Sequence, residues 1–257
     1  MTSVEKLTTP SNPAAIVRDR SDLRRAAPRA HAIAFDVEGT LIDCVPQTIA
    51  CWHQTLADHG FDFSYEELHR YSGMDPELML ARLLPDRDEA LEKSLLDQQG
   101  ERYREKFLPT VKPFPGGRAL FSALASDGHR LGLATTCQPD ELRVYLRLLD
   151  ITDYVSAAVC GDDVQREKPA PDLVELAGAR LAAETLAGLY MVGDTPYDAA
   201  AGLGAGAKPV GTLGGGFSAD ELIHAGCVDV AANPIELLPL LRSLTEPKQK
   251  GLSVRSR

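Results

Sequence analysis

Residues 31–43 read HAIAFDVEGTLID, a short apolar run that ends abruptly in carboxylates. Ala32–Phe35 has the length and composition of a strand buried on both faces. Asp36 follows where such a strand ends, and Glu38 stands two residues later. Open parallel sheets bind ligands beyond the carboxyl ends of their strands. The segment therefore predicts either a nucleophile beside a general acid and base or a polar strand exit closed by an Asx turn.

Helix and strand patterns alternate from Gly116 to the end of the ordered pattern near Leu244, which is typical of a doubly wound parallel sheet. The expected helices cover residues 117–126, 140–149, 171–183 and 196–206, and the expected strands cover 131–135, 154–160, 188–192 and 209–213. A final helix, strand and helix complete the chain. We therefore expect an α/β fold with a Rossmann-like core.

The segment between the first strand and this alternating part carries helical patterns and no strand signal. Ile49, Trp52 and Leu56 recur at three- and four-residue spacing and predict a helix over 46–60. Ser64 and Glu67 form a capping-box pattern that opens a second helical run, with further helices expected at 76–84 and 86–107. The return segment KPFPGG, residues 112–117, indicates a hinge. This part is expected to be a helical cap inserted into the core.

These patterns divide the chain into four parts. Residues 30–45 and 113–244 form the expected core, and 46–112 form the cap. Residues 1–29 are expected to be a poorly ordered extension and 245–257 a loose basic tail.

Composition limits the class of function. The net charge of −10 argues against a nucleic-acid partner, whose binding surface is normally basic. The five cysteines form no CxxC pair, which favours reduced thiols and a cytoplasmic location. No apolar run approaches the ~20 residues of a membrane span, and no signal-peptide core is seen, so no membrane association is expected. The sequence does not determine the oligomeric state.

Polar groups follow three later strands as well. Thr135 and Thr136 end one strand, Lys168 stands in the Pro-rich loop EKPAPD, and Asp194 and Asp198 lie in GDTPYD after another. Carboxylates of two strand ends suit Mg²⁺, which binds one or two of them together with phosphate oxygens and water. The ammonium and hydroxyl groups suit a phosphoryl group.

The four segments FDVEGTL, LATT, EKPAPD and GDTPYD resemble the motifs of the haloacid dehalogenase superfamily, in their order along the chain and in their placement at strand ends. The resemblance covers roughly residues 30–243. It is to the branch with a helical cap after the first strand, which includes phosphoglycolate phosphatases and β-phosphoglucomutases. These motifs are specific for the superfamily and only weakly specific for the substrate.

The resemblance implies a role for each motif residue. Asp36 would be the nucleophile that forms an aspartyl phosphate, and Glu38 the general acid and base. Thr135 would hydrogen-bond the transferring phosphoryl group, with Thr136 as the alternative if the strand register differs by one. Lys168 would neutralise charge on that group and on Asp36.

The resemblance also implies a Mg²⁺ site. Asp194 would bind the ion together with the Asp36 carboxylate and the Glu38 backbone carbonyl, and Asp198 would support this set of ligands.

Glu38 departs from the usual pattern, in which a second Asp stands at this position. The extra methylene displaces the carboxyl by roughly one C–C bond, and general acid catalysis is sensitive to such a shift. The same Asp-x-Glu-Gly-Thr form occurs in the enolase-phosphatase family. Dehalogenases lack an acid here and phosphonate hydrolases have a small residue, so the carboxylate favours hydrolysis of a phosphoester.

Weaker candidates lie outside these motifs. Residues 68–75 resemble the substrate-specificity loop of the cap, with Gly73 at its turn and Arg70 as a residue that contacts substrate or is simply exposed. Asp162 and Asp163 either assist Lys168 and the metal or have ordinary loop roles. The glycines of GGGF, residues 214–217, have no Gly-Lys-Ser/Thr continuation and are interpreted as a flexible connection.

The sequence thus predicts a Mg²⁺-dependent phosphatase of a small phosphorylated metabolite. A phosphomutase of the same fold and a non-catalytic protein that binds a phosphorylated ligand are the alternatives. Hydrolysis of a carbon–halogen or phosphonate bond is the least favoured.

Overall fold

A computed structural model of the chain describes residues 31–245, and the expectations for 1–29 and for most of the basic tail lie outside this range. Its centre is a six-stranded, all-parallel sheet in the order β5-β4-β1-β6-β7-β8. The strands are β1 (Ala32–Phe35), β4 (Arg130–Ala134), β5 (Val155–Val159), β6 (Leu189–Gly193), β7 (Lys208–Thr212) and β8 (Val230–Ala231). The predicted α/β class and doubly wound parallel sheet are confirmed.

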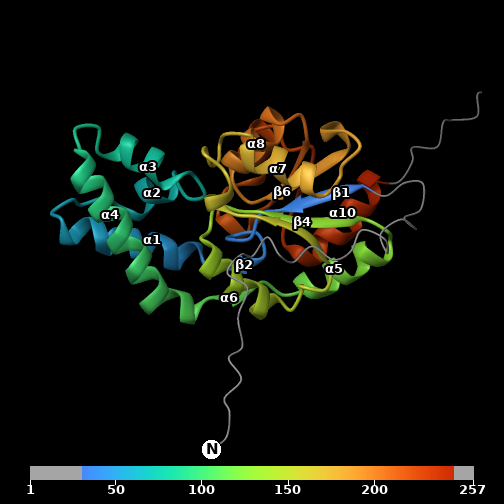
Figure 1. The fold of residues 1–257 in the computed structure, drawn as a ribbon, viewed down its shortest axis with the longest axis horizontal. Coiled ribbons are helices and arrows are strands. Elements are labelled where there is room, and N and C mark those ends of the chain that lie inside the picture. The colour runs from blue at the N-terminus through green and yellow to red at the C-terminus, as the bar shows by residue number, and fades with distance from the viewer. Residues whose placement is uncertain (1–30, 246–257) are drawn as a thin grey trace, which may run out of the picture.

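Helices cover both faces of the sheet (Figure 1). The helices of the core are α5 (Gly117–Ser126), α6 (Pro139–Leu149), α7 (Asp172–Arg180), α8 (Pro196–Gly204), α9 (Ala219–His224) and α10 (Pro234–Thr245). Side chains of α5, α6 and α10 pack in one apolar cluster and those of α7 and α8 in another. This two-sided burial explains why β1 is apolar throughout and not alternating.

Strand β1 supplies both clusters because successive side chains of a strand point to opposite faces. Ile33 and Phe35 are fully buried on the side of α5, where the Phe35 ring lies 4.7 Å from that of Phe121. Ala32 and Ala34 lie on the other side, against α7. The pairing of large residues on one face with small ones on the other lets α7 approach the sheet closely.

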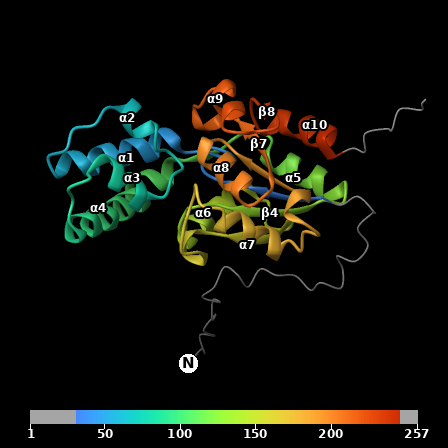
Figure 2. The ribbon, with the colours of Figure 1, turned by 90° about the horizontal axis from the view of Figure 1, so that it is seen from above.

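The expected helical insertion lies to one side of the sheet (Figures 1 and 2). It contains α1 (Val45–Asp58), α2 (Tyr65–His69), α3 (Pro76–Leu83) and α4 (Glu89–Arg102), followed by a π-helical turn (Tyr103–Phe107) and a 3-10 turn (Leu108–Thr110). Two short antiparallel strands, β2 (Ile42–Asp43) and β3 (Lys112–Pro113), join it to the core. We refer to the helices between these two strands as the cap.

The cap has an apolar core of its own. Trp52 and Leu56 on α1 pack with Leu80 on α3 and Leu95 on α4. The Ser64–Glu67 capping box is formed as expected: the Glu67 backbone N–H donates to Ser64 Oγ and the Ser64 N–H to the Glu67 carboxylate.

One expected helix differs from the structure. The pattern predicted a continuous helix over 86–107, whereas α4 ends at Arg102 and the next five residues form the π-helical turn. A π turn inserts an extra residue and so rotates the following side chains. Tyr103, the first residue of this turn, is buried, with its side chain 3% exposed. Helical periodicity does not predict such an insertion.

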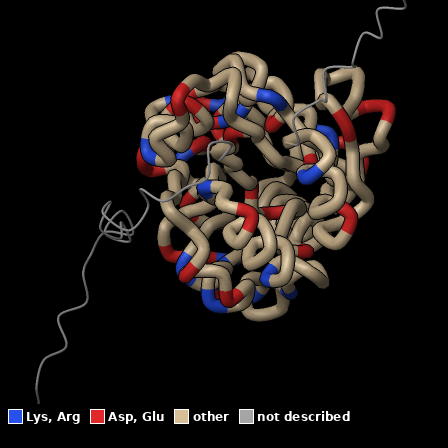
Figure 3. Tube along the Cα trace, turned by 90° about the vertical axis from the view of Figure 1, so that its right-hand side faces the viewer, with Lys and Arg blue, Asp and Glu red and all other residues tan. Residues whose placement is uncertain are grey.

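Along the described residues, Lys and Arg are interspersed with Asp and Glu in the view of Figure 3. Within residues 31–245, no helix has both the length and the apolar character required to cross a bilayer.

Candidate active site

The site lies where the sheet order brings β4, β1 and β6 side by side. Asp36 follows β1, and its backbone N–H donates to the Val192 carbonyl of β6 at 2.8 Å. This bond fixes the first residue beyond β1 against the neighbouring strand. The carboxyl ends of three strands therefore open into one crevice, as the sequence predicted.

Lys168 lies between two carboxylates of this crevice. Its Nζ is 2.5 Å from Asp36 Oδ1 and 2.7 Å from Asp198 Oδ1. The lysine side chain is 1% exposed, so the three groups interact in a medium of low polarity. Burial alone lowers the pKa of a lysine, but the carboxylates of Asp198 and Asp36 outweigh it and raise the pKa of Lys168 above its usual value. Lys168 is therefore an ammonium at neutral pH.

Asp194, the first carboxylate after β6, has one of its two oxygens hydrogen-bonded. Thr40 Oγ1 donates to Asp194 Oδ1 at 2.6 Å. The other oxygen, Oδ2, is buried without a hydrogen-bond partner among the described residues. Burial raises the pKa of Asp194, and the charges of Asp36 and Asp198 add to the effect. A buried carboxylate oxygen without a donor is costly unless a cation binds it.

Two glycines make room for Asp194. A Cβ on Gly215 would lie 2.0 Å from Asp194 Oδ2, and a Cβ on Gly39 would lie 2.2 Å from the same atom. Gly39 also has a φ of +80°, which disfavours other residues. The sequence interpretation of residues 214–217 as a flexible connection was therefore incomplete, because Gly215 is required by its close approach to a carboxylate.

Asp198 lies in the first turn of α8. Its Oδ2 accepts from the backbone N–H of Thr195 at 3.1 Å and from Thr195 Oγ1 at 2.7 Å, which is a capping box. These bonds leave Oδ1 directed at Lys168. One carboxylate thus both caps the helix and holds the lysine.

A metal can be held by three of these carboxylates. One oxygen each from Asp36, Asp194 and Asp198 lie within 4.8 Å of one another, and all three residues are buried. The donor set is all oxygen, as hard divalent cations prefer. Burial, opposed by the Lys168 charge, raises the pKa of Asp36 to about 7. A cation bound to the Asp36 carboxylate would lower this pKa again.

Glu38 lies close by but has different partners. Tyr145 OH donates to Glu38 Oε1 at 2.7 Å. Burial and the charge of Glu141 raise the pKa of Glu38 to about 7. A carboxyl that titrates near neutral pH can both give and take a proton.

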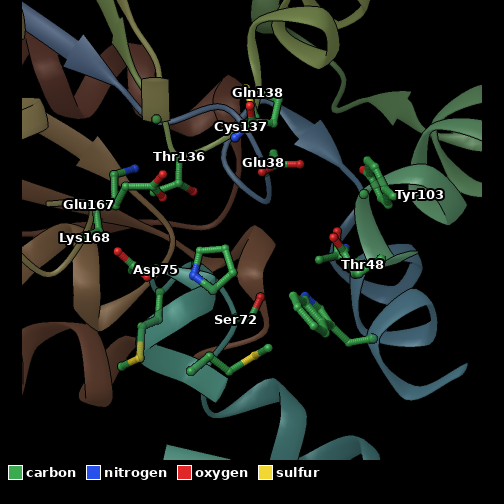
Figure 4. Close-up of a pocket in the computed structure, with 18 of the residues that line it drawn as sticks. Glu38, Thr48, Ser72, Asp75, Tyr103, Thr136, Cys137, Gln138, Glu167 and Lys168 are labelled. Atoms are coloured by element: carbon green, nitrogen blue, oxygen red, sulfur yellow. The ribbon is translucent and has the colours of Figure 1, made fainter. Parts of the chain in front are cut away.

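The two threonines after β4 have different environments. Thr136 lines the cavity, as Figure 4 shows, whereas Thr135 is fully buried and its Oγ1 accepts from the Cys137 N–H at 3.3 Å. Strand β4 ends at Ala134, one residue before the expected end. Thr136, given as the alternative, is therefore the one that faces the cavity.

A cavity of about 860 Å³ separates these core residues from the cap. Figure 4 shows Ser72 and Asp75 of the cap facing Thr136 and Lys168 of the core across it. The Asp75 backbone N–H donates to the Lys168 carbonyl at 2.9 Å, so the cap contacts the loop that carries Lys168 directly. Gly73 lines the cavity, whereas Arg70 is exposed and is not one of its lining residues.

The two further candidates, Asp162 and Asp163, lie in the loop after β5. Asp163 forms an ion pair with Arg180 at 2.8 Å and accepts from the Cys160 N–H at 3.0 Å, which is a loop role. Asp162 is exposed at the cavity edge. Neither residue contacts Lys168.

Three residues of the site were not predicted from the sequence. Gly215 was interpreted only as part of a connection, and Tyr103 and Tyr145 had the pattern of ordinary core residues. Their roles depend on contacts between different elements: Tyr145 lies 107 residues from Glu38 and 42 from Tyr103 in the chain, and Gly215 contacts Asp194 of the preceding strand end.

Comparison with known proteins identifies the family of this fold and site. A family model described as haloacid dehalogenase-like hydrolase matches residues 33–212. The chain belongs to this hydrolase family. The match spans all four motifs, so the resemblance noted from the motifs is confirmed.

Curated relatives of the chain include two kinds of phosphatase. It is 30% identical to a phosphoglycolate phosphatase of Yersinia pestis over 217 residues, and this aligned region covers 81% of this chain and 92% of the relative. It is 31% identical over 187 residues to the pyrophosphatase PpaX of Bacillus pumilus, covering 70% and 82%.

Solved structures show the same architecture. A hydrolase from Pseudomonas syringae has a TM-score of 0.78 and 29% identity, covering 84% of this chain and 99% of that one. A predicted phosphatase from Clostridium acetobutylicum has a TM-score of 0.73 at 21% identity, covering 83% and 99%, and is a likeness of fold alone.

Proposed function

We propose that this hydrolase is a Mg²⁺-dependent phosphatase that acts on a small phosphorylated metabolite through an aspartyl phosphate. The observation that carries the proposal is the buried Lys168 ammonium, held against Asp36 in the wall of the cavity. A fixed cation beside a carboxylate nucleophile stabilises the charge of a transferring phosphoryl group.

The residues allow a balanced two-step reaction. A carboxylate oxygen of Asp36 attacks phosphorus, the bond to the leaving oxygen breaks, and protonated Glu38 gives its proton to that oxygen. Ionised Glu38 then takes a proton from water, whose oxygen attacks the phosphorus of the aspartyl phosphate. The acyl phosphate bond breaks, inorganic phosphate leaves, and Asp36 and Glu38 return to their starting states.

Asp36, Asp194 and Asp198 are the residues that would hold Mg²⁺, and the unpartnered Asp194 oxygen supports this assignment. The ion would neutralise phosphate charge and orient the phosphoryl group for attack in line. Lys168 holds Asp36 and Asp198 in place on the other side of the cluster.

The charge of the cavity wall narrows the substrate class. Of the described residues that line the cavity, eleven are Asp or Glu and two, Lys168 and Arg104, are basic. Asp75 and Glu77 belong to this acidic lining outside the catalytic cluster. Such a wall repels a second anionic group. It favours a phosphomonoester whose remaining part is neutral or cationic over phosphoglycolate or pyrophosphate, the substrates for which the relatives are named.

Phosphate release from a panel of phosphomonoesters, with Mg²⁺ and with chelator, tests the function. Metal-dependent release is expected, with Asp36→Asn reducing it by about 10³-fold or more. Acid quenching of enzyme in turnover should trap phosphate on the parent chain and none on Asp36→Asn. Phosphorylated amino alcohols should exceed phosphoglycolate in kcat/KM.

The alternatives give different results in the same assay. A phosphomutase would need a bisphosphate activator and would release little phosphate. A binding protein would retain Mg²⁺ or a phosphorylated ligand without turnover. Either outcome would contradict the phosphatase proposal.

A further inference from the structure

Two buried tyrosines form a chain of hydroxyl groups that ends on Glu38. Tyr145 OH donates to Glu38 Oε1 at 2.7 Å, and Tyr103 OH lies 2.7 Å from Tyr145 OH. Tyr145 belongs to α6 of the core and Tyr103 to the π-helical turn that leaves the cap. Glu38, in the loop after β1, is thus linked to the cap through one core side chain.

The direction of the bonds follows from the number of protons. A tyrosine hydroxyl has one proton to donate, and that of Tyr145 is directed to the Glu38 carboxylate. The bond between the two hydroxyls must then use the proton of Tyr103, with Tyr145 accepting. A hydroxyl that accepts one hydrogen bond is a better donor of the next.

Both tyrosine side chains are largely buried. Tyr145 is fully buried and Tyr103 is 3% exposed, and each packs in the large apolar cluster of the core. Tyr145 is enclosed by this cluster, whereas Tyr103 also lines the cavity between core and cap (Figure 4). The bond from Tyr145 to Glu38 therefore depends on the packing of the core, and the bond from Tyr103 on the position of the cap exit.

We propose that Tyr145 is a positioning residue for Glu38, and that Tyr103 couples this position to the seating of the cap. A glutamate has one more rotatable bond than the aspartate usual at this place, and its carboxyl therefore samples more positions. The Tyr145 hydroxyl fixes Oε1 and leaves Oε2 available for proton transfer. This inference rests on the proposed role of Glu38 as general acid and base.

Substrates with different leaving groups separate positioning of Glu38 from general damage. An alkyl phosphate needs a proton on its leaving oxygen, whereas the p-nitrophenolate of p-nitrophenyl phosphate leaves without one. In Tyr145→Phe, kcat/KM for an alkyl phosphate should fall about tenfold while that for p-nitrophenyl phosphate changes less than about twofold. Tyr103→Phe should give the same selective loss at about threefold.

The double variant with Glu38→Asp provides a second test. The shorter aspartate cannot reach Tyr145 from the same backbone position, so Tyr145→Phe should cause no further loss in that background. Tyr190→Phe is the matched control: Tyr190 is also a buried tyrosine of the core, but its hydroxyl donates to the Leu244 carbonyl at 2.7 Å, and its loss should leave both substrates unaffected.

Two results would overturn the inference while leaving the phosphatase proposal intact. One is an equal loss for the two substrates in both tyrosine variants, and the other is an undiminished effect of Tyr145→Phe in the Glu38→Asp background. Absence of phosphate release from the parent chain would instead refute the proposed function and the inference together. If Tyr145→Phe does not fold, as judged by circular dichroism, the same ratio measured on Tyr103→Phe decides.

Discussion

Lys168 and Asp36 are separated by 132 residues in the chain, yet Nζ of one lies 2.5 Å from Oδ1 of the other, and both are buried. The second carboxylate, Asp198, lies 2.7 Å from the same nitrogen. One cation thus balances two anions that would otherwise repel each other and Asp194.

Replacing this cation should affect stability and activity together. Lys168→Met leaves buried carboxylates without their partner, and we expect it to cost about 3–5 kcal/mol in the free energy of unfolding. Phosphate release should fall by about 10³-fold or more. Lys93→Met, which removes an exposed lysine paired with Asp97, is the control and should change stability by less than about 1 kcal/mol. Urea denaturation and phosphate assays measure both; equal effects of the two variants would contradict the assignment.

Magnesium should stabilise the parent protein through Asp194. At a Mg²⁺ concentration one hundred times its Kd, binding to the folded state alone adds about 2.7 kcal/mol to the free energy of unfolding. Asp194→Asn should lose this gain in thermal denaturation with Mg²⁺ against chelator. Asp162→Asn is a matched control because Asp162 lines the same cavity but lies outside the metal cluster. Retention of the Mg²⁺ effect in Asp194→Asn would show that the ion binds elsewhere.

Gly215→Ala should weaken metal binding without altering the backbone. The added Cβ would lie 2.0 Å from Asp194 Oδ2, so the carboxylate must move. We expect the Kd for Mg²⁺ to rise about 10- to 100-fold. Gly188→Ala is the control: both glycines end a 3-10 turn, but the nearest atom to a Cβ at 188 is 3.8 Å away. Isothermal titration of both variants with Mg²⁺ makes the comparison, and unchanged affinity in Gly215→Ala would refute the prediction.

The Arg180–Asp163 pair should support stability and not catalysis. Arg180 Nη2 donates to Asp163 Oδ1 at 2.8 Å, and Nη1 donates to the Ala158 carbonyl at 2.6 Å. The bonds from Arg180 hold the pKa of Asp163 below its ordinary value of 3.8. The contribution of this pair is therefore complete above pH 3.8 and is lost as the pH falls through the lowered pKa.

Arg180→Ala should cost about 1–2 kcal/mol at pH 7. The difference from the parent chain in urea denaturation should persist at pH 5 and narrow at pH 3. Phosphate release should stay within about twofold. A large loss of activity would mean that Asp163 acts on the site after all.

The positions of the candidate site could be predicted because their signals lie in short segments of the sequence. Asp36, Lys168 and Asp194 each follow a strand or stand in a Pro-rich loop, and the parallel order of the strands brings their ends together. The helices of the core were also predicted closely, with the expected helix at 117–126 matching α5. The π-helical turn was not predicted from local signals. The apolar and polar residues around it keep the spacing of an ordinary α-helix, and this spacing does not indicate an inserted residue.

The sequence alone indicated the family, the parallel sheet and which charged residues stand at the strand ends. It could do so because strand ends, turns and motif spacing are properties of short segments. Which side chains meet was decided by the tertiary structure. Tyr145 reaches Glu38 from a helix 107 residues away, and Gly215 is small because Asp194 occupies the space beside it. Such contacts depend on packing between distant segments, and a linear pattern of apolar and polar residues does not specify their partners.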